Sequence, residues 1–459
     1  MNRPSSFVFR PSRASGGLLG LLTSIAAVLL AAAAVAEPRA LSLADALAAA
    51  RADNPRLALR RALAARAESR KLGARQAFLP RLGVDATYLR LDDGIVDSLS
   101  VEGRELSPLL SSFALTPLDG IASGVEIVQP LVNVGAWHAG RQAEAGVAAA
   151  GLSLERARRV VDAAVVEAYY GLRTAERRVA ATRAGLAAAE RGLRQAEAGF
   201  EQELVAPVDV ASARSRAALL RSELAAARAG VAAAEAGLGR LLGFDDGRAL
   251  RLTDPVPAPV SPPERTPARE AVLAVRRDVR ALEKSVEAAD LGVRRARAAF
   301  LPDLNLYARY NRIRGDRPLD FRADGWLLAV NLEWQLFAGF GQIAGVREAS
   351  ANERVARARL EAARRQAWSE VRSARANWDA AVSGWRSARA AVEAARESLA
   401  LTEARYAEGL DDMTALLRAQ AEALRARLRE VDGRYRAVVA RTRYRLSAED
   451  GPVVRGSGR

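Results

Sequence analysis

The chain has 459 residues, a formal net charge of +15, 27% charged residues and only 5% aromatic residues. This composition is typical of long helices with narrow apolar seams and argues against a thick globular core. Nearly all basic residues are arginines that alternate with acidic residues along the predicted helices, a pattern typical of solvated helix faces, so nucleic-acid binding is not expected. The chain has no cysteine, which excludes disulfides, thiolate metal sites and a lipid-modified cysteine.

The first 36 residues have the order of a cleavable secretory signal. Basic residues come first, an apolar run over 18–35 follows, and the small-residue pattern Ala-Val-Ala occupies 34–36. We therefore predict export of the chain. An uncleaved membrane anchor stays open as an alternative, because the apolar run approaches the length needed to span a bilayer. No later stretch of that length is free of charges, so a mature protein that resides in a membrane would have to span it with strands.

The remaining sequence is organised as two similar halves. The segment Ala-Phe-Leu-Pro at 77–80 recurs at 299–302, and Phe200 and Tyr406 occupy matching places further along. Such self-similarity predicts a duplicated structural unit. We place the first repeat at 37–246, a stiff proline-rich linker at 247–267, the second repeat at 268–447 and a disordered tail at 448–459.

Each repeat is predicted to contain an opening helix, a medium helix and a long hairpin of two helices. The hairpins cover 135–243 and 341–446, where apolar residues recur at steps of three and four. This spacing indicates coiled-coil packing. The stripe that contains Trp378 and Trp385 is interpreted as part of the packed seam, with no ligand assigned. A helix of about 66 residues would extend about 100 Å, a proportion that suits a cylinder wall.

Two strand pairs are also predicted, near 80–91 and 122–133 in the first repeat and near 302–314 and 325–337 in the second. Apolar and polar residues alternate along them, which is typical of a lipid-facing barrel. In the last strand Leu328, Val330 and Leu332 share the apolar face. The polar face is predicted to line a barrel lumen with Asn331, Glu333 and Gln335. A soluble sheet that covers helices would give the same alternation and stays open as an alternative.

Four strands are too few to close a membrane barrel in one chain, because a closed barrel needs about eight strands to leave no unpaired edge. Two copies would give eight strands and little lumen, whereas three would give twelve and an open pore. Closed cyclic symmetry makes a homotrimer the expected assembly. The predicted fold is therefore mainly α with membrane β: four strands per chain in a trimeric twelve-stranded barrel, continued by a long coiled-coil α-barrel.

The ordered set of features resembles the TolC-like outer-membrane factors. The set comprises the two copies, the Phe-Leu-Pro entry into each first strand, the glycine-containing exits from the strands at 131–135 and 336–341, and the turns at the far helical tips. The resemblance implies a location in the outer membrane of a Gram-negative-type cell, in contact with outer-membrane lipid, with the helical part in the periplasm. It also implies a passive exit duct of a tripartite efflux pump or type I secretion system. The implied partners are a periplasmic adaptor and an inner-membrane transporter of RND or ABC type.

The same resemblance assigns roles at the helical tips. Adaptor docking is expected at Leu204, Val205, Gly409 and Leu410. A periplasmic gate is expected at Asp209, Tyr406, Asp411 and Arg418. Within this set Tyr406 and Asp209 match a tyrosine–aspartate contact that closes the pore in family members, whereas Asp411 replaces a family arginine. Arg418 and Ala415 stand where some members carry an acidic ring, so plugging by divalent cations is not expected. These polar residues could instead serve only to solvate a turn.

No recognisable set of catalytic acids, bases or nucleophiles occurs in the sequence, so no enzyme is expected. His138 is the only histidine and is interpreted as a packing residue near the junction of barrel and helix; no metal and no cofactor are predicted. A periplasmic coiled-coil adaptor is the alternative function, although adaptors have one hairpin where this chain has two. A soluble structural coiled coil that binds no pump is the third possibility.

Overall fold

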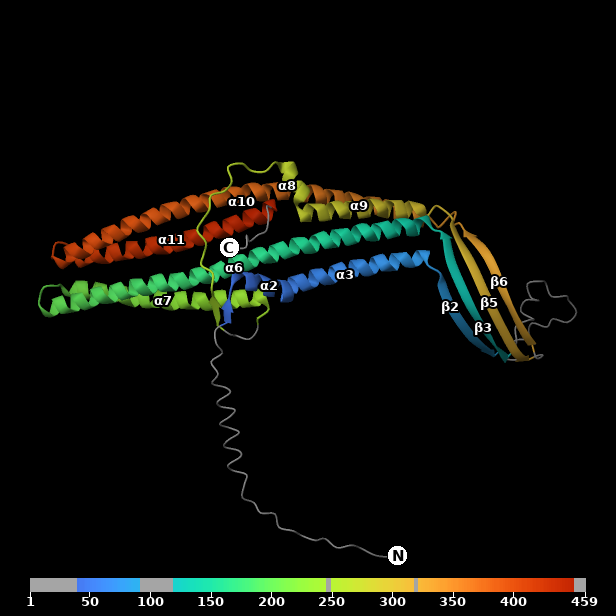
Figure 1. The fold of residues 1–459 in the computed structure, drawn as a ribbon, viewed down its shortest axis with the longest axis horizontal. Coiled ribbons are helices and arrows are strands. Elements are labelled where there is room, and N and C mark those ends of the chain that lie inside the picture. The colour runs from blue at the N-terminus through green and yellow to red at the C-terminus, as the bar shows by residue number, and fades with distance from the viewer. Residues whose placement is uncertain (1–38, 91–118, 245–248, 318–320, 450–459) are drawn as a thin grey trace, which may run out of the picture.

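The protein is an elongated rod with a β-sheet at one end and two helical tips at the other (Figure 1). The structure is a computed structural model that describes residues 39–90, 119–244, 249–317 and 321–449. The predicted signal peptide, the greater part of the segment between the first two strands, and residues 450–459 of the predicted tail lie outside this description.

Each repeat follows the same order of helices and strands. The first repeat contains α2 (Leu43–Asp53), α3 (Pro55–Arg75), β2 (Arg81–Arg90), β3 (Asp119–Val132), α6 (Val134–Glu201) and α7 (Pro207–Leu242). The second contains α8 (Arg269–Val275), α9 (Arg277–Ala298), β5 (Asp303–Arg317), β6 (Phe321–Glu333), α10 (Gly341–Ala407) and α11 (Met413–Ala448). A short 3-10 helix, Gln76–Phe78, joins α3 to β2.

The helices form a wall in which one long helix lies beside two shorter ones placed end to end. In the first repeat α3 and α7 follow one another along α6, and in the second α9 and α11 follow one another along α10 (Figure 1). At 68 residues α6 extends about 100 Å. Narrow apolar seams hold the wall together, such as the cluster of Ala189, Leu220 and Leu424. Alanine and glycine allow the close approach: a Cβ on Gly185 would lie 2.8 Å from Leu424 Cδ2.

The four long strands form one antiparallel sheet in the order β2-β3-β5-β6. The two strand pairs therefore meet at β3 and β5, and β2 and β6 are the edges of the sheet within the chain. The register places Leu304 opposite Leu332 and Asn305 opposite Asn331, so near the helices residues of like character face the same side of β5 and β6. The helices leave the sheet at one end only, and neither face is covered by a helix (Figure 1).

A belt at mid-length ties the two repeats together. Two short strands that the sequence did not predict, β1 (Arg39–Leu41) and β4 (Leu250–Leu252), pair in parallel. The hydroxyl of buried Tyr169 donates to Leu41 O at 2.9 Å and accepts from Asp254 N at 3.0 Å. The linker beyond β4 crosses the second hairpin, where Trp378 Nε1 donates to Val260 O at 3.0 Å. Trp378 is 5% exposed within an apolar cluster, in agreement with the predicted seam.

Several boundaries differ from those predicted: β3 begins at Asp119 instead of near 122, and β6 at Phe321 instead of near 325. Two of the differences affect residues that were assigned a role or a state. Strand β6 ends at Glu333, so Gln335 follows the strand instead of lying in it, because the chain turns there to enter α10. The tail predicted to begin at residue 448 is wrong for its first two residues. Ala448 ends α11, and Glu449 is its buried C-cap, held by arginines from other helices.

Candidate functional site

One face of the sheet is an exposed apolar surface. Its residues are unusually open for their type: Trp326 is 79% exposed, Leu328 59%, Val330 62% and Leu332 61%. Strands β2 and β3, on the other side of β5, add exposed apolar side chains to the same face, namely Leu82, Val84, Tyr88, Ile121, Val125 and Ile127. Large contiguous apolar patches are rare on soluble monomers and mark a surface that another phase or molecule covers. This argues against the soluble sheet that the sequence left open.

The opposite face carries a polar network. Arg309 of β5 forms ion pairs with Asp85 of β2 at 2.9 Å and Glu126 of β3 at 3.0 Å, and Tyr307 donates to Glu126 at 3.1 Å. This network links three strands across one face, in the alternating pattern of a sheet with one oily and one wet side.

The residues predicted to line a lumen lie at the helical end of this polar face. Asn331 and Glu333 are exposed on β6, with Glu333 opposite Asp303 of β5. Gln335, although beyond the strand, borders a cavity of about 490 Å³ together with Asp303, Glu333 and Arg295. The three predicted residues therefore share one region of the molecule.

The two tips have the same backbone turn. At the first tip Leu204 N donates to Gly199 O at 2.8 Å, and at the second Leu410 N donates to Arg405 O at 2.9 Å. Both turns place one residue in the left-handed region, Glu203 at φ 58° and Gly409 at φ 74°. This is a helix C-terminal motif that normally requires glycine. The first tip keeps its geometry although glutamate stands at the glycine position.

The side chains expected to dock an adaptor divide into two groups. Leu204 is 77% exposed and Leu410 is 61% exposed, so both present apolar surface at the end of the rod. Val205 instead turns inward and packs with the cluster around Val210, which explains Gly199: a Cβ there would lie 2.6 Å from Val205 Cγ2. Gly409 serves the turn by its positive φ.

The predicted gate residues are brought together only in part. Tyr406 packs among apolar residues of both tips, and burial together with the nearby negative charge of Asp209 raises the pKa of its hydroxyl. No hydrogen bond joins Tyr406 to Asp209 within the described part of the chain. Asp411 forms an ion pair with Arg405 at 2.9 Å, and this hydrogen-bonded carboxylate raises the pKa of the Arg405 guanidinium. Arg418 is exposed on α11.

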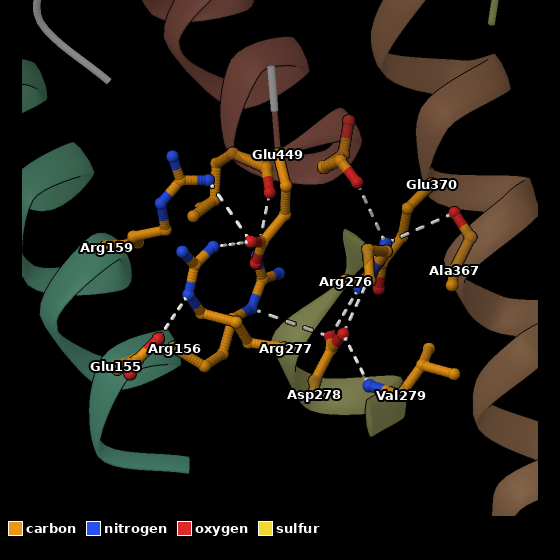
Figure 2. Close-up of polar contacts among 12 residues, drawn as sticks. Glu155, Arg156, Arg159, Arg276, Arg277, Asp278, Val279, Ala367, Glu370 and Glu449 are labelled. Carbon is orange, nitrogen blue, oxygen red and sulfur yellow. Dashed lines mark hydrogen bonds and ion pairs between the residues drawn. The ribbon is translucent and has the colours of Figure 1, made fainter. Parts of the chain in front are cut away.

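A buried ionic cluster, not predicted from the sequence, joins the end of α11 to the start of α9 (Figure 2). The Glu449 carboxylate is fully buried and forms ion pairs with Arg156 and Arg159 of α6, each at 3.2 Å, and with Arg277 of α9. Glu155 pairs with Arg277 at 2.7 Å. The cluster ties three helices together where one helix of the wall ends and the next begins.

Arg276 forms the second half of this junction. Its side chain is 3% exposed and pairs with Glu370 of α10 at 2.9 Å and with Asp278. It also donates to Ala367 O at 3.2 Å and Ser447 O at 3.3 Å (Figure 2). Burial tends to raise the pKa of Asp278, but the hydrogen bond from Arg276 and the charges of Arg156 and Arg276 hold that pKa below its usual value.

The corresponding junction of the first repeat uses a neutral side chain. Asn54 is 2% exposed; its Nδ2 donates to Leu241 O at 3.0 Å and its Oδ1 accepts from Arg56 N at 3.0 Å. Asn54 thereby caps α3 and satisfies a last-turn carbonyl of α7. The position matches Arg276 at the offset of 222 residues that relates 77–80 to 299–302. Only this offset could have identified the pair in the sequence.

Comparison with known proteins identifies the relatives of this two-repeat rod. The profile of the family described as "Outer membrane efflux protein" matches residues 46–244 and 268–447, which together are most of the chain. The chain belongs to the outer membrane efflux protein family. A comparison with curated proteins finds no match.

Solved bacterial membrane proteins have the same fold. A membrane protein from Pseudomonas aeruginosa is 22% identical with a TM-score of 0.75, covering 88% of this chain and 93% of that one. The Campylobacter jejuni CmeC outer membrane channel is 18% identical with a TM-score of 0.75, covering 91% and 87%. VceC from Vibrio cholerae is 20% identical with a TM-score of 0.73, covering 88% and 95%.

The chain is therefore a TolC-like outer-membrane exit duct. The predicted family, the mainly helical duplicated fold, the location in the outer membrane with a periplasmic helical part, and the channel function are confirmed. The adaptor alternative is wrong, because the family match spans two hairpins, each attached to a strand pair.

The remaining expectations concern metal ligands, the single histidine and membrane-spanning helices, and the described residues bear on each of them. No described group of histidine, aspartate and glutamate side chains could hold a metal ion. His138 lies near the start of α6, stacked edge to face on Trp137 with ring centroids 4.8 Å apart. None of the described helices combines the length and the hydropathy that crossing a bilayer requires.

Proposed function

We propose that three copies of the protein join their sheets into one twelve-stranded barrel whose apolar face contacts outer-membrane lipid and whose polar face lines the pore. The observation that carries this proposal is the combination of two unpaired edges, β2 and β6, with the exposed apolar face between them. Each unpaired backbone group in lipid costs about 2–7 kcal/mol, so a stable structure in the membrane must pair both edge strands. Pairing β6 of one copy with β2 of the next satisfies both.

Cysteine cross-linking tests this closure without interference, because the natural chain has no cysteine. One cysteine on the polar face of β2 and one on that of β6 are introduced together at a series of positions, and the membranes are oxidised. The expected result is a ladder that ends at a covalent trimer on a denaturing gel. A matched control pair in β2 and β5 should give no cross-linked species, because β3 lies between those strands. Monomers alone from every β2–β6 pair would overturn the proposal.

We further infer that the tips dock a periplasmic adaptor, which couples the duct to an inner-membrane transporter of RND or ABC type. The exposed residues Leu204 and Leu410 support this proposal, because each presents apolar surface at the far end of the rod. Cargo would pass through the duct unchanged, so the protein itself is proposed to perform no catalysis. Replacing both leucines by aspartate should abolish copurification of the adaptor and leave the trimer intact. A Leu59→Asp variant, equally exposed on α3, provides the control.

The tip residues Tyr406 and Asp209 are proposed to hold the pore shut. Tyr406 and Asp209 come from opposite hairpins, and the charge of Asp209 acts on the Tyr406 hydroxyl. The double change Tyr406→Phe and Asp209→Ala should raise single-channel conductance in planar bilayers. Arg425→Gln, exposed further along α11 and outside the predicted gate, serves as the comparison. Unchanged conductance in the double variant would remove the pair from the gate.

A further inference from the structure

A cleft of about 550 Å³ lies between the two hairpins, in the half of the rod that carries the tips. All four long helices border it, and each contributes one arginine: Arg177 from α6, Arg216 from α7, Arg396 from α10 and Arg427 from α11. Apart from Gln420, its other borders are apolar or small, with Leu220, Leu399, Leu424 and Val431 among them. No carboxylate of a described residue lines the cleft.

The positive charge of this arginine cleft is largely uncompensated within the described chain. Arg427 pairs with Glu430 at 3.1 Å, whereas Arg177, Arg216 and Arg396 form no ion pair with a described residue. Neighbouring arginines on the same helices are paired: Arg178 with Asp432 at 2.9 Å, Arg214 with Glu197 at 3.1 Å and Arg389 with Glu393 at 3.6 Å. Further arginines of these helices, such as Arg183 and Arg425, are also without an ion pair to a described residue, so the cleft is set apart by the gathering of its arginines around one hollow that no described carboxylate lines.

Two buried polar atoms without hydrogen-bond partners lie at the cleft. Arg216 Nε is shielded from solvent and has no hydrogen-bond partner, and neither does Gln420 Oε1, whose residue also borders the cleft. Such atoms are rare in folded proteins, and a missing ligand is one established reason for them. The positive charge of the cleft also acts on a nearby residue. The pKa of Arg434 is lowered, first by burial and second by the charge of Arg177.

We propose that the arginine cleft binds an organic anion that joins a sulfonate, phosphate or carboxylate group to an apolar body. The guanidinium groups supply planar donors for the anionic group. The leucines and alanines supply a surface for the rest of the molecule, which a small inorganic anion would leave uncovered. A ligand in the cleft contacts both hairpins of one protomer. The site therefore depends neither on closure of the trimeric barrel nor on adaptor docking.

Calorimetric titration of the full-length protein, reconstituted in nanodiscs of zwitterionic lipid, tests this site. The probe is naphthalene-1,5-disulfonate, with inorganic sulfate titrated in parallel. We expect about one disulfonate bound per protomer and at least tenfold weaker binding of sulfate. The variant Arg216→Gln with Arg396→Gln should weaken disulfonate binding at least tenfold. The matched control Arg214→Gln with Arg389→Gln removes two paired arginines from the same helices and should bind as the natural protein does.

Three outcomes would overturn the proposal: no disulfonate binding, equal binding of disulfonate and sulfate, or equal loss of binding in the two double variants. Native mass spectrometry of each variant shows whether the assembly is intact. If the first double variant does not assemble, the single change Arg177→Gln repeats the test with one charge removed. Because cross-linking of β2 to β6 reports barrel closure separately, a failed titration with a closed barrel refutes the cleft alone.

Discussion

The two helix junctions solve one structural problem with different chemistry. In each repeat a returning helix ends where a medium helix begins, and the last turn of the first leaves carbonyl groups without partners. Asn54 satisfies Leu241 O in the first repeat, and Arg276 satisfies Ser447 O in the second. The duplicated fold has kept the position and the task of this side chain while its charge has changed.

The change of charge explains the rest of the second junction. An amide is neutral, so Asn54 can be buried once its hydrogen bonds are formed and needs no opposite charge nearby. A buried guanidinium is costly unless carboxylates surround it, and Asp278 and Glu370 fill that role. Glu449 stands beside them with three arginines of its own. The Asn54 side chain thus contributes two hydrogen bonds to its junction, whereas Arg276 belongs to an ionic network whose members depend on one another.

Removing Glu449 should produce the largest difference between the junctions. Glu449→Ala leaves Arg156, Arg159 and Arg277 without their buried partner, and breaking a buried ion pair in this way costs about 3–5 kcal/mol. Hydrogen exchange of the intact trimer, read on peptides from the start of α9, should show a free energy of opening lowered by an amount near the bottom of that range, because the arginines are partly exposed.

The control is Glu393→Ala, which breaks an exposed ion pair with Arg389. It should change the free energy of opening by less than about 0.5 kcal/mol. If Glu449→Ala and Glu393→Ala behave alike, the ionic junction adds no stability.

Acid should distinguish the junctions next, by an effect smaller than removal of Glu449. The pKa of Asp278 is lower in the folded protein than in the unfolded chain, so the stability that Asp278 contributes is complete above its unfolded pKa of about 3.9 and is lost as pH falls through the folded value. Exchange at the start of α9, corrected for intrinsic rates, should accelerate below about pH 4 relative to the start of α3.

Asp278→Asn supplies the internal check, because it should remove the extra acid sensitivity of α9. Equal acid sensitivity at both junctions in the natural protein would contradict the assigned role of Asp278.

Asn54→Ala should have a moderate effect, restricted to the first junction. The substitution removes the N-cap of α3 and leaves Leu241 O without its donor, at a cost of about 1–2 kcal/mol. Asn54→Asp separates the two contributions, since aspartate keeps the cap and loses the Nδ2 donor. Exchange at the starts of α3 and α9 measures both variants. A loss that appears equally at α9 would mean that the junctions do not open independently.

The sequence predicted the parts of this molecule that depend on periodicity. Alternation gave the two faces of the sheet, because side chains in a strand point to opposite sides at every step. Heptad spacing predicted the hairpins, and the offset between Phe200 and Tyr406 placed two tips whose turns share two equivalent backbone hydrogen bonds. The junctions could not be predicted, because Arg156, Arg277 and Glu449 are far apart in the chain and look like ordinary charges of solvated helices.

The short belt strands β1 and β4 and the end of β6 could not be predicted from the sequence either. Strands of three residues are too short for a recognisable alternation, and their pairing is decided by contacts such as that of Tyr169 with Leu41. The end of β6 is predicted too far along the chain because Trp334, Gln335 and Leu336 continue its alternation after its ladder has ended. Pattern alone cannot mark the residue at which hydrogen bonding stops.

The tips offer the smallest and most symmetrical test, because the same turn carries glutamate in one repeat and glycine in the other. A residue other than glycine in the left-handed region costs about 1 kcal/mol, so Glu203→Gly should stabilise the first tip and Gly409→Ala should destabilise the second by similar amounts. Hydrogen exchange of the last turn before each tip measures the two changes. Opposite shifts of about 1 kcal/mol would show that the first tip retains its turn against its own backbone preference, held there by packing such as that of Val205 on Gly199. If Glu203→Gly had no effect while Gly409→Ala destabilised its tip, the glutamate would have to be compensated in the turn itself.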